Sequence, residues 1–266
     1  PPSIHLRQPY WRHWHHFAAY VSRLSMVMSQ GYHVADVALL YPITTVHAHW
    51  IAGNSFETAA DQSANTAFLQ ARHLFDAGID LDFVDDRSLV EADVINGKLH
   101  IGNLEFSVLL LPALSTIRRD SMEKACELFR AGGTVVAFGR LPADSPEHGR
   151  KDPRINELIG EIFGVRDAAL WVQKYESEGE RRSFNRGVRN TCRGGGTGLF
   201  LPSHAFGNAA TIADMISDTI DRDVIADADK IWHTHQRTNE ADIYFFCSHA
   251  PMARTYQLSL RTDGAP

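Results

Sequence analysis

The chain has 266 residues, with 32 acidic against 26 basic side chains and a net charge of −6. It holds no Lys/Arg-rich run, so the electrostatic footprint of a nucleic-acid-binding protein is missing. No apolar stretch approaches the roughly 20 residues that cross a bilayer. We therefore expect a soluble protein with one main core and appended elements, and with neither nucleic acid nor membrane as a partner.

Cysteine usage and the first residues bear on the origin of the chain. Cys126, Cys192 and Cys247 are far apart and lack CxxC spacing, so neither a disulfide framework nor a zinc site is expected. The chain begins at Pro1 without an initiator methionine, a start that a signal-cleaved protein and an excised fragment share. We favour a fragment of a longer protein, and the compartment is left open.

The first predicted elements are a helix and a buried strand. Apolar residues recur at three- and four-residue steps between residues 8 and 30, and Gly31 supplies a stop, so we expect a helix that packs one apolar face. Residues 34–42 form a short apolar run that ends in proline, which is typical of a strand buried on both faces of a parallel sheet. A polar loop is expected to follow.

The central part of the chain alternates strands and helices. Buried strands are predicted over residues 80–84, 107–111 and 134–138, and helices over residues 58–77, 121–130 and 153–163. Asn96-Gly97 predicts a tight turn and a small hairpin at the edge of the sheet. Because such helices must cover both faces of a sheet, the predicted fold class is α/β with a doubly wound parallel sheet.

The last third of the chain has a weaker pattern. The stretch from residue 173 to residue 198 is polar and ends in a glycine-rich run, which predicts a mobile loop or an insertion. A helix is expected over residues 209–221, and β segments are expected over residues 231–235, 242–248 and 254–260.

The loop over residues 44–55 is the first candidate site. Ligands of open α/β sheets bind beyond the carboxyl ends of the strands, which is where this loop should lie. His47, His49, Trp50 and Asn54 suit sugar hydroxyls and ring faces, and we identify them as candidate substrate-binding residues. The alternative is a packed loop in which the histidines bond to backbone groups and Trp50 fills a core.

Two histidine pairs raise the question of a metal. His47 and His49 would share one face of an extended segment, and His233 and His235 repeat the spacing. No third ligand is fixed near either pair by the sequence, and half-buried histidines commonly serve as hydrogen-bonding groups. We expect no metal site.

Four clustered carboxylates could belong to a glycosidase. Asp80, Asp82, Asp85 and Asp86 would supply the two side chains that such an enzyme holds across a sugar bond. The alternative, which we favour, is that Asp85 and Asp86 bond to their own turn and lie in solvent.

Cofactor-binding and nucleophile patterns give no support to an autonomous enzyme. The run from Gly194 to Gly198 follows no buried strand and opens no obvious helix, so it does not predict a phosphate loop. A sharp strand-to-helix turn would present a nucleophile, but Phe138-Gly139 occupies that turn here. Cys247 and Ser248 are neighbours that would point to opposite faces of a strand. We expect neither a catalytic residue nor a cofactor in this chain.

Several segments resemble large bacterial glycoside hydrolases similar to family-106 α-L-rhamnosidases. The resemblance is carried by Gln8-Pro9-Tyr10-Trp11, Arg23-Leu24-Ser25 and the run from Val34 to Pro42. In those proteins a catalytic (β/α)8 barrel ends in such a helix. After this helix the chain of those proteins passes into a second, flavodoxin-like domain. That domain resembles class I glutamine amidotransferases or the trimerisation domain of family-42 β-galactosidases. The run from Leu109 to Val136 resembles that second domain, and residues 241–246 resemble the entry to a β-sandwich.

The resemblance implies a division of the chain and a role for it. Residues 1–33 would be the end of an upstream barrel, 34–235 the amidotransferase-like domain with an insertion near 173–198, and 236–266 the approach to a truncated β-sandwich. The catalytic carboxylates would lie upstream, and Phe138-Gly139 replaces the amidotransferase cysteine. The implied role is a non-catalytic supporting domain, whose partners are the barrel, the sandwich and, through the parent, a carbohydrate.

Two points stay open. The chain could instead be a self-contained amidotransferase-like hydrolase or a nucleotide-binding flavodoxin-like module. The resemblance is compatible with a homo-oligomer and with a parent protein that is secreted or periplasmic. No residue of the sequence indicates either property.

Overall fold

The computed structural model describes residues 7–52, 58–165, 188–201, 209–227, 231–250 and 252–262. Its centre is a six-stranded sheet with the order β3-β2-β7-β8-β10-β9. The strands are β2 (Val37–Leu40), β3 (Leu81–Val84), β7 (Val108–Leu111), β8 (Thr134–Phe138), β9 (Val188–Thr191) and β10 (Thr197–Leu201). All pairings are parallel except that of β9 with β10. The protein is thus a mixed α/β domain with a mostly parallel sheet, and the predicted parallel arrangement of the first four strands is confirmed.

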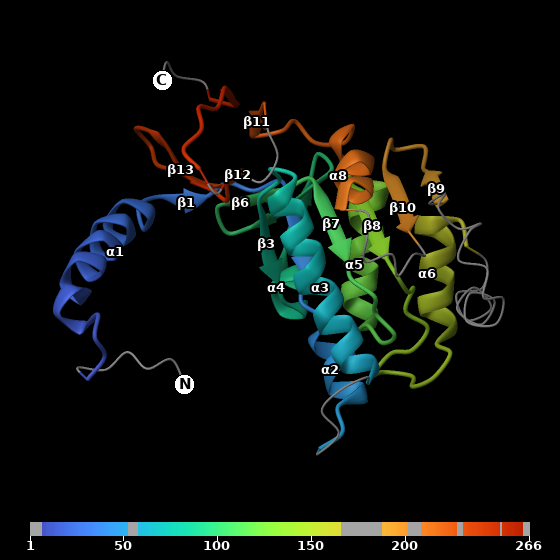
Figure 1. Ribbon diagram of the computed structural model, residues 1–266. Coiled ribbons are helices and arrows are strands. Elements are labelled where there is room, and N and C mark those ends of the chain that lie inside the picture. Colours follow the sequence, from blue (N-terminus) through green and yellow to red (C-terminus); the bar gives the residue numbers. More distant parts are fainter. Residues whose placement is uncertain are drawn as a thin grey trace.

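Helices cover both faces of this sheet (Figure 1). They are α3 (Ala59–Asp76) and α8 (Ala209–Ser217) on one face, and α4 (Asp86–Glu91), α5 (Arg119–Arg130) and α6 (Pro153–Phe163) on the other. Each face has its own apolar core, because the sheet separates the two groups of buried side chains. Every residue of β2 and β7 is buried, which explains why these strands read as unbroken apolar runs.

Capping residues explain where two of the helices begin. Thr58 and Asp61 form a reciprocal capping box at the start of α3. Asp152 accepts from the Arg154 N–H at the start of α6, Pro153 follows in the first turn, and Gly164 ends that helix in the left-handed conformation. The predicted bounds of α6 are confirmed for this reason.

The glycine-rich run is part of the sheet, so the prediction of a mobile loop is wrong for residues 188–198, whereas residues 173–187 lie outside the described ones. Its last residues begin β10, which pairs with β8. A Cβ on Gly196 would lie 1.7 Å from the carbonyl oxygen of Phe129, and one on Gly198 would lie 1.9 Å from that of Ile162. Glycine is needed because the strand passes against the backbone of two helices.

Smaller sheets surround the main one. β4 (Asp93–Ile95), β5 (Lys98–Ile101) and β6 (Leu104–Phe106) form an antiparallel sheet. The predicted hairpin is therefore present, but it forms a separate sheet and is not attached to the edge of the main one. Leu99 and Phe106 are fully buried and belong to the apolar core on the face that α4, α5 and α6 cover.

The C-terminal strands lie at the amino edge of the main sheet. β1 (Tyr32–His33), β12 (Ile231–Arg237) and β13 (Asp242–Ser248) form one sheet, and β11 (Val224–Ala226) pairs with β14 (Leu258–Leu260). The expected domain boundary at residue 236 falls inside β12.

The first helix stands away from the core. A 3-10 turn η1 (Trp11–His13) leads into α1 (Trp14–Met28), and none of their residues is buried. In Figure 1, α1 projects from the side of the sheet on which β3 lies. The expectation that α1 packs an apolar face is wrong within the described residues, because that face meets no core here. The part of the chain that the structure describes contains no helix long and apolar enough to span a bilayer.

Candidate functional site

A cleft of about 520 Å³ opens at the carboxyl edge of the sheet. It lies between the helices that follow β2 and β3, namely α2 (Ile43–His49) and α4, and the segment before α5. Thr44, His47, Asp86, Arg118 and Asp120 are among its lining residues. Its position agrees with the rule that ligands of open α/β sheets bind beyond the carboxyl ends of the strands.

The Asp86 side chain links two of the helices around this cleft. Its carboxylate accepts hydrogen bonds of 2.6 Å from the hydroxyls of Thr44 and Ser121, so it ties α2 to α5. Asp86 is buried, and the expectation that it lies in solvent is wrong. Asp85 behaves as expected: it is exposed, and its side chain accepts from the Ser88 N–H at 2.7 Å to cap α4. That backbone hydrogen bond holds the pKa of Asp85 below its usual value.

The other two carboxylates of the acidic group lie elsewhere. Asp80 and Asp82 both contact His33, at 2.7 Å and 2.8 Å, near the amino end of β3. The four carboxylates are therefore divided between opposite ends of one strand, and they do not assemble into one site.

The predicted loop over residues 44–55 forms the short helix α2 in its first half. Positions two apart on a helix point in different directions, so His47 and His49 do not share the face that an extended segment would give them. His47 is exposed, whereas His49 Nε2 lies 2.7 Å from the hydroxyl of Ser115. Trp50 is 69 % exposed, so it does not fill a core. Asn54 lies outside the described residues.

The order of the strands makes α2 and Ser115 neighbours. The chain adds β3 on one side of β2 and β7 on the other, so the strand order reverses at this point, and the loops after β2 and β7 diverge and leave room for a ligand. The buried Thr45 hydroxyl donates to the Thr116 carbonyl at 2.7 Å and accepts from the Thr116 N–H at 3.2 Å. This reciprocal pair fixes α2 against the loop after β7. No sequence pattern singles out Ser115 and Thr116, because only the fold brings them to residue 45.

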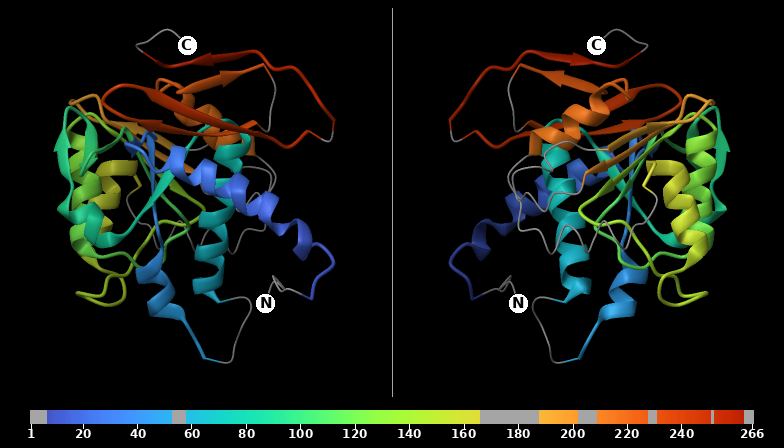
Figure 2. Two further views of the ribbon diagram at one scale, coloured as in Figure 1. Left: turned by 90° about the vertical axis from the view of Figure 1, so that its left-hand side faces the viewer. Right: turned by 90° about the vertical axis from the view of Figure 1, so that its right-hand side faces the viewer.

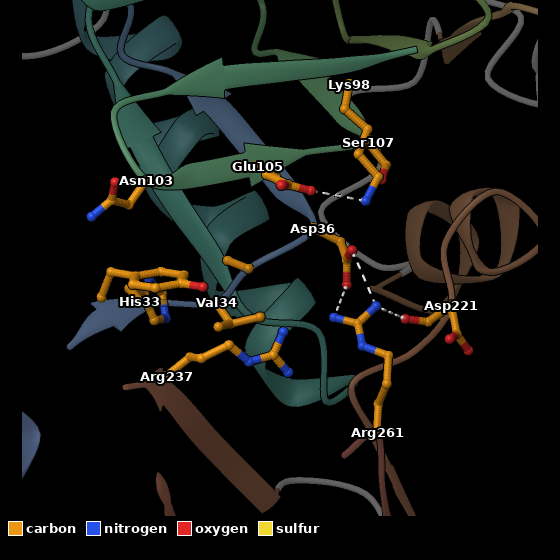
Figure 3. Close-up of a pocket in the computed structure, with 12 residues that line it drawn as sticks. His33, Val34, Asp36, Lys98, Asn103, Glu105, Ser107, Asp221, Arg237 and Arg261 are labelled. Atoms are coloured by element: carbon orange, nitrogen blue, oxygen red, sulfur yellow. Dashed lines mark hydrogen bonds and ion pairs between the residues drawn. The ribbon is translucent and has the colours of Figure 1, made fainter. Parts of the chain in front are cut away.

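A second cleft of about 480 Å³ lies at the amino edge (Figure 3). Residues before β2 and β7, the β5–β6 hairpin and the C-terminal strands line it. Arg261 Nη2 lies 2.9 Å from Asp36 Oδ2, and Lys98 donates to Glu105 at 3.2 Å. Burial raises the pKa of Asp36, and the Arg261 guanidinium opposes that shift. These opposite charges face one another, so this cleft presents few unpaired charges to a ligand.

Two histidines next to this cleft bridge pairs of carboxylates. Burial alone would lower the pKa of His33, but its bonds to Asp80 and Asp82 outweigh burial and raise the pKa to about 10. His235 sits between Asp223, at 3.0 Å, and Asp242, at 2.9 Å. The His33 contacts join β1 to β3 of the main sheet, and the His235 contacts join β12 to β13 and to the residue before β11.

His233 and His235 share one face of β12, as predicted, and both are buried. Among the described residues His233 Nε2 has no hydrogen-bond partner, its nearest carboxylate being that of Asp223 at 3.7 Å, and burial lowers its pKa. Within the part of the chain that the structure describes, no cluster of three or more His, Cys, Asp or Glu side chains is arranged to hold a metal ion.

The cysteines lie apart from both clefts. Cys126 is buried in α5, where desolvation raises the pKa of its thiol to about 12. Cys192 donates to the Phe129 carbonyl at 3.1 Å. Cys247 is exposed on β13, opposite Trp232 of β12.

A mostly parallel sheet with helices on both faces defines the class, a mixed α/β domain. Residues 4–265 match the model of the alpha-L-rhamnosidase family, glycoside hydrolase family 106. The chain belongs to this family of glycoside hydrolases.

Individual relatives place the same segment in longer proteins. A Formosa agariphila protein with the name "Putative beta-glucuronidase" is 25 % identical over 258 residues, which are 96 % of this chain and 17 % of that protein. A rhamnosidase from Novosphingobium sp. PP1Y is 16 % identical, with a TM-score of 0.51 over 92 % of this chain and 20 % of that one. A β-galactosidase from Bacillus circulans sp. alkalophilus is 13 % identical, with a TM-score of 0.63 over 92 % of this chain and 40 % of that one. The two structures show a shared fold, and the chain spans about a fifth or less of the first two proteins.

Proposed function

We propose that this chain is a non-catalytic supporting domain of a larger glycoside hydrolase that resembles the α-L-rhamnosidases. The observation that carries the proposal is the state of the acidic side chains in the carboxyl-edge cleft. Asp86 is bonded to two hydroxyls, Asp120 to Arg118, and Glu91 to Arg87, while Asp85 caps α4.

Glycoside hydrolysis needs a different arrangement. One carboxyl must keep its proton near neutral pH and the other must be free to act as base or nucleophile across the sugar bond. In this cleft the Arg118 hydrogen bond lowers the pKa of Asp120, and the Ser88 N–H lowers that of Asp85. Both shifts favour permanently ionised, structural carboxylates.

The finer class of the fold is also a proposal: an amidotransferase-like, flavodoxin-like domain. Numbered along the chain, the parallel strands β2, β3, β7, β8 and β10 stand in the order 2-1-3-4-5. This is the order of flavodoxin-like sheets. At the position of the amidotransferase nucleophile the chain has Gly139, with a positive φ of 78°, so that activity is not part of the proposal.

The proposed partners are other parts of the same parent protein. The exposed aromatic surface of α1 suits the end of an upstream catalytic barrel, and the strands after residue 236 suit a passage into a downstream β-sandwich. Carbohydrate would reach this domain only through the parent.

Assays on aryl α-L-rhamnosides and related aryl glycosides test the non-catalytic role. We expect no turnover by the 266-residue chain and turnover by the full-length parent. Asp86→Asn in the parent should lower its stability and leave its kcat within about twofold. Turnover by the isolated chain that one substitution within it abolishes would overturn the proposal.

We propose that the end of α2 and the residues that follow it in the sequence complete a sugar site of the parent protein. Trp50 would stack on a pyranose face, and His47, His49 and Asn54 would donate or accept hydrogen bonds. Trp50→Ala in the full-length enzyme should raise KM several-fold and leave the folding of this domain unchanged. Ile225→Ala is the matched control, because Ile225 is 54 % exposed on β11, far from α2. An unchanged KM for Trp50→Ala would count against any role of this residue in the site.

The second candidate, a self-contained hydrolase, has one observation in its favour. Ser115 and His49 form a hydroxyl–imidazole pair at 2.7 Å, at the point between β2 and β7 where the strand order reverses. Ser115 is only 9 % exposed, however, and no carboxylate contact to His49 is present in the described ranges. Labelling with a fluorophosphonate decides: modification of Ser115 that is lost in His49→Gln would favour this candidate.

A further inference from the structure

An aromatic cluster lies exposed at one edge of the main sheet. Tyr41 follows β2, Phe68 is on α3 and Phe83 is on β3, with ring centroids 5.5–6.4 Å apart. Phe68 is 55 % exposed and Phe83 is 40 % exposed. We call these three residues the edge cluster. Large aromatic groups that gather on a surface mark an interaction site more often than scattered apolar residues do.

The strand beneath this cluster has an open side. β3 is the outermost strand of the six-stranded sheet, so one row of its backbone groups faces away from β2. Natural proteins usually cover such an edge, because its unpaired donors and acceptors invite association with other chains. Both the side chains and the backbone therefore point to a partner at this edge.

The exposed surface of α1 lies on the same side of the molecule. Phe17 is 53 % exposed, Tyr20 46 % and Met26 70 %, and the rings of Trp14 and Phe17 lie 4.9 Å apart. Figure 1 shows α1 beyond β3, and the view from that side in Figure 2 shows α1 passing in front of α3. One body placed at this side could contact both α1 and the edge cluster.

We propose that the edge cluster is a second docking surface for the segment that precedes this chain in the parent protein, in addition to α1. The inference rests on the proposed function, since it assigns a further contact to the same upstream partner. That segment would bury Phe68 and Phe83 and cover the open side of β3. The domain would then be held at two separate points, and α1 would not act as a flexible tether.

Two observations favour this occupant over a second copy. The Novosphingobium rhamnosidase has four fifths of its length outside the matched region, so its family offers a large body to dock. The described chain also begins on this side, with residue 7 ahead of α1. Direct attachment gives the preceding segment a high effective concentration at this surface, so a modest apolar contact suffices to hold it.

Accessibility of residue 68 tests the proposal. Phe68→Cys is made in the 266-residue chain and in the full-length parent, and labelling by a maleimide is followed by peptide mass analysis. We expect rapid labelling in the isolated chain and labelling at least about tenfold slower in the parent. Ile225→Cys is the matched control, because it starts equally exposed and should label at the same rate in both proteins.

Each outcome separates the alternatives. Equal labelling of Phe68→Cys in the two proteins overturns the proposal. Slow labelling in the isolated chain that speeds up on dilution also overturns it and identifies a second copy as the occupant. Phe68→Asp should leave the melting temperature of the isolated chain unchanged and make the junction after α1 more sensitive to proteases in the parent; equal sensitivity contradicts the second contact. None of these readouts depends on turnover, so failure of this inference is distinct from failure of the proposed function.

Discussion

Replacing His33 by glutamine should destabilise the domain in a pH-dependent way. His33 donates to Asp80 and Asp82, and the Asp80 side chain is only 5 % exposed while that of Asp82 is 31 % exposed. Loss of a hydrogen bond to a buried charged group costs about 1.5–3 kcal/mol, and an exposed ion pair contributes below about 1 kcal/mol. The free energy of unfolding should therefore fall by about 2–3 kcal/mol in His33→Gln, and by less than about 1 kcal/mol in the control Asp82→Asn.

The pH dependence follows from the direction of the shift. The pKa of His33 is raised from 6.5 in the unfolded chain to about 10 in the folded one. Its contribution is thus fully present below about pH 6.5 and is lost as the pH rises through about 10. Urea unfolding of wild type and His33→Gln across this range measures the difference between them. A difference that stays constant with pH, or grows as the pH rises, would refute the assignment of a charged His33 between two carboxylates.

Three further predictions concern the core and the thiols. Gly198→Ala should prevent stable folding or lower the melting temperature sharply, because its Cβ would clash with the Ile162 carbonyl oxygen; Gly160→Ala, whose Cβ would meet its nearest neighbour at an ordinary 3.5 Å, is the milder control. Asp152→Ala removes the N-cap of α6 together with the two bonds that the buried Asp152 carboxylate accepts from the Arg119 guanidinium, and should lower the free energy of unfolding by roughly 2–4 kcal/mol, measured by urea titration; an unchanged midpoint would contradict this role of Asp152. In the native protein an aromatic disulfide reagent should modify Cys247 quickly and Cys126 only on unfolding, because burial raises the pKa of Cys126 to about 12; rapid loss of both thiols would show that α5 opens readily.

Short-range patterns were enough to predict the centre of the sheet. The strands β2 and β7 are buried on both faces, so every side chain is apolar and the run is visible without any partner. The helix α6 carries its own start and stop signals in Asp152, Pro153 and Gly164. Where the signal is contained within a dozen neighbouring residues, the sequence alone determines the element.

The missed elements depend on residues that are distant along the chain. Local patterns do not predict the start of β10, because Gly196 and Gly198 are required there by the nearby backbones of α5 and α6. The polar stretch that begins at Thr44 forms α2, which is held by Asp86 and by Thr116. The local propensities of these residues reflect neither the nearby helix backbones nor the bonds to Asp86 and Thr116.

The candidate site also has a part that the sequence alone predicts and a part that depends on the tertiary structure. Composition and position were enough to direct attention to the segment after β2, and the choice of His47, His49 and Trp50 stays a prediction. Only the tertiary structure decided that Asp80 and Asp82 bind His33, whereas Asp86 binds two hydroxyls beside the carboxyl-edge cleft. Likewise, the bonds between His33 and Asp80 join residues 47 positions apart. A charge pattern along the chain indicates which groups are present, but their roles depend on which partners the folded chain brings within a few ångströms.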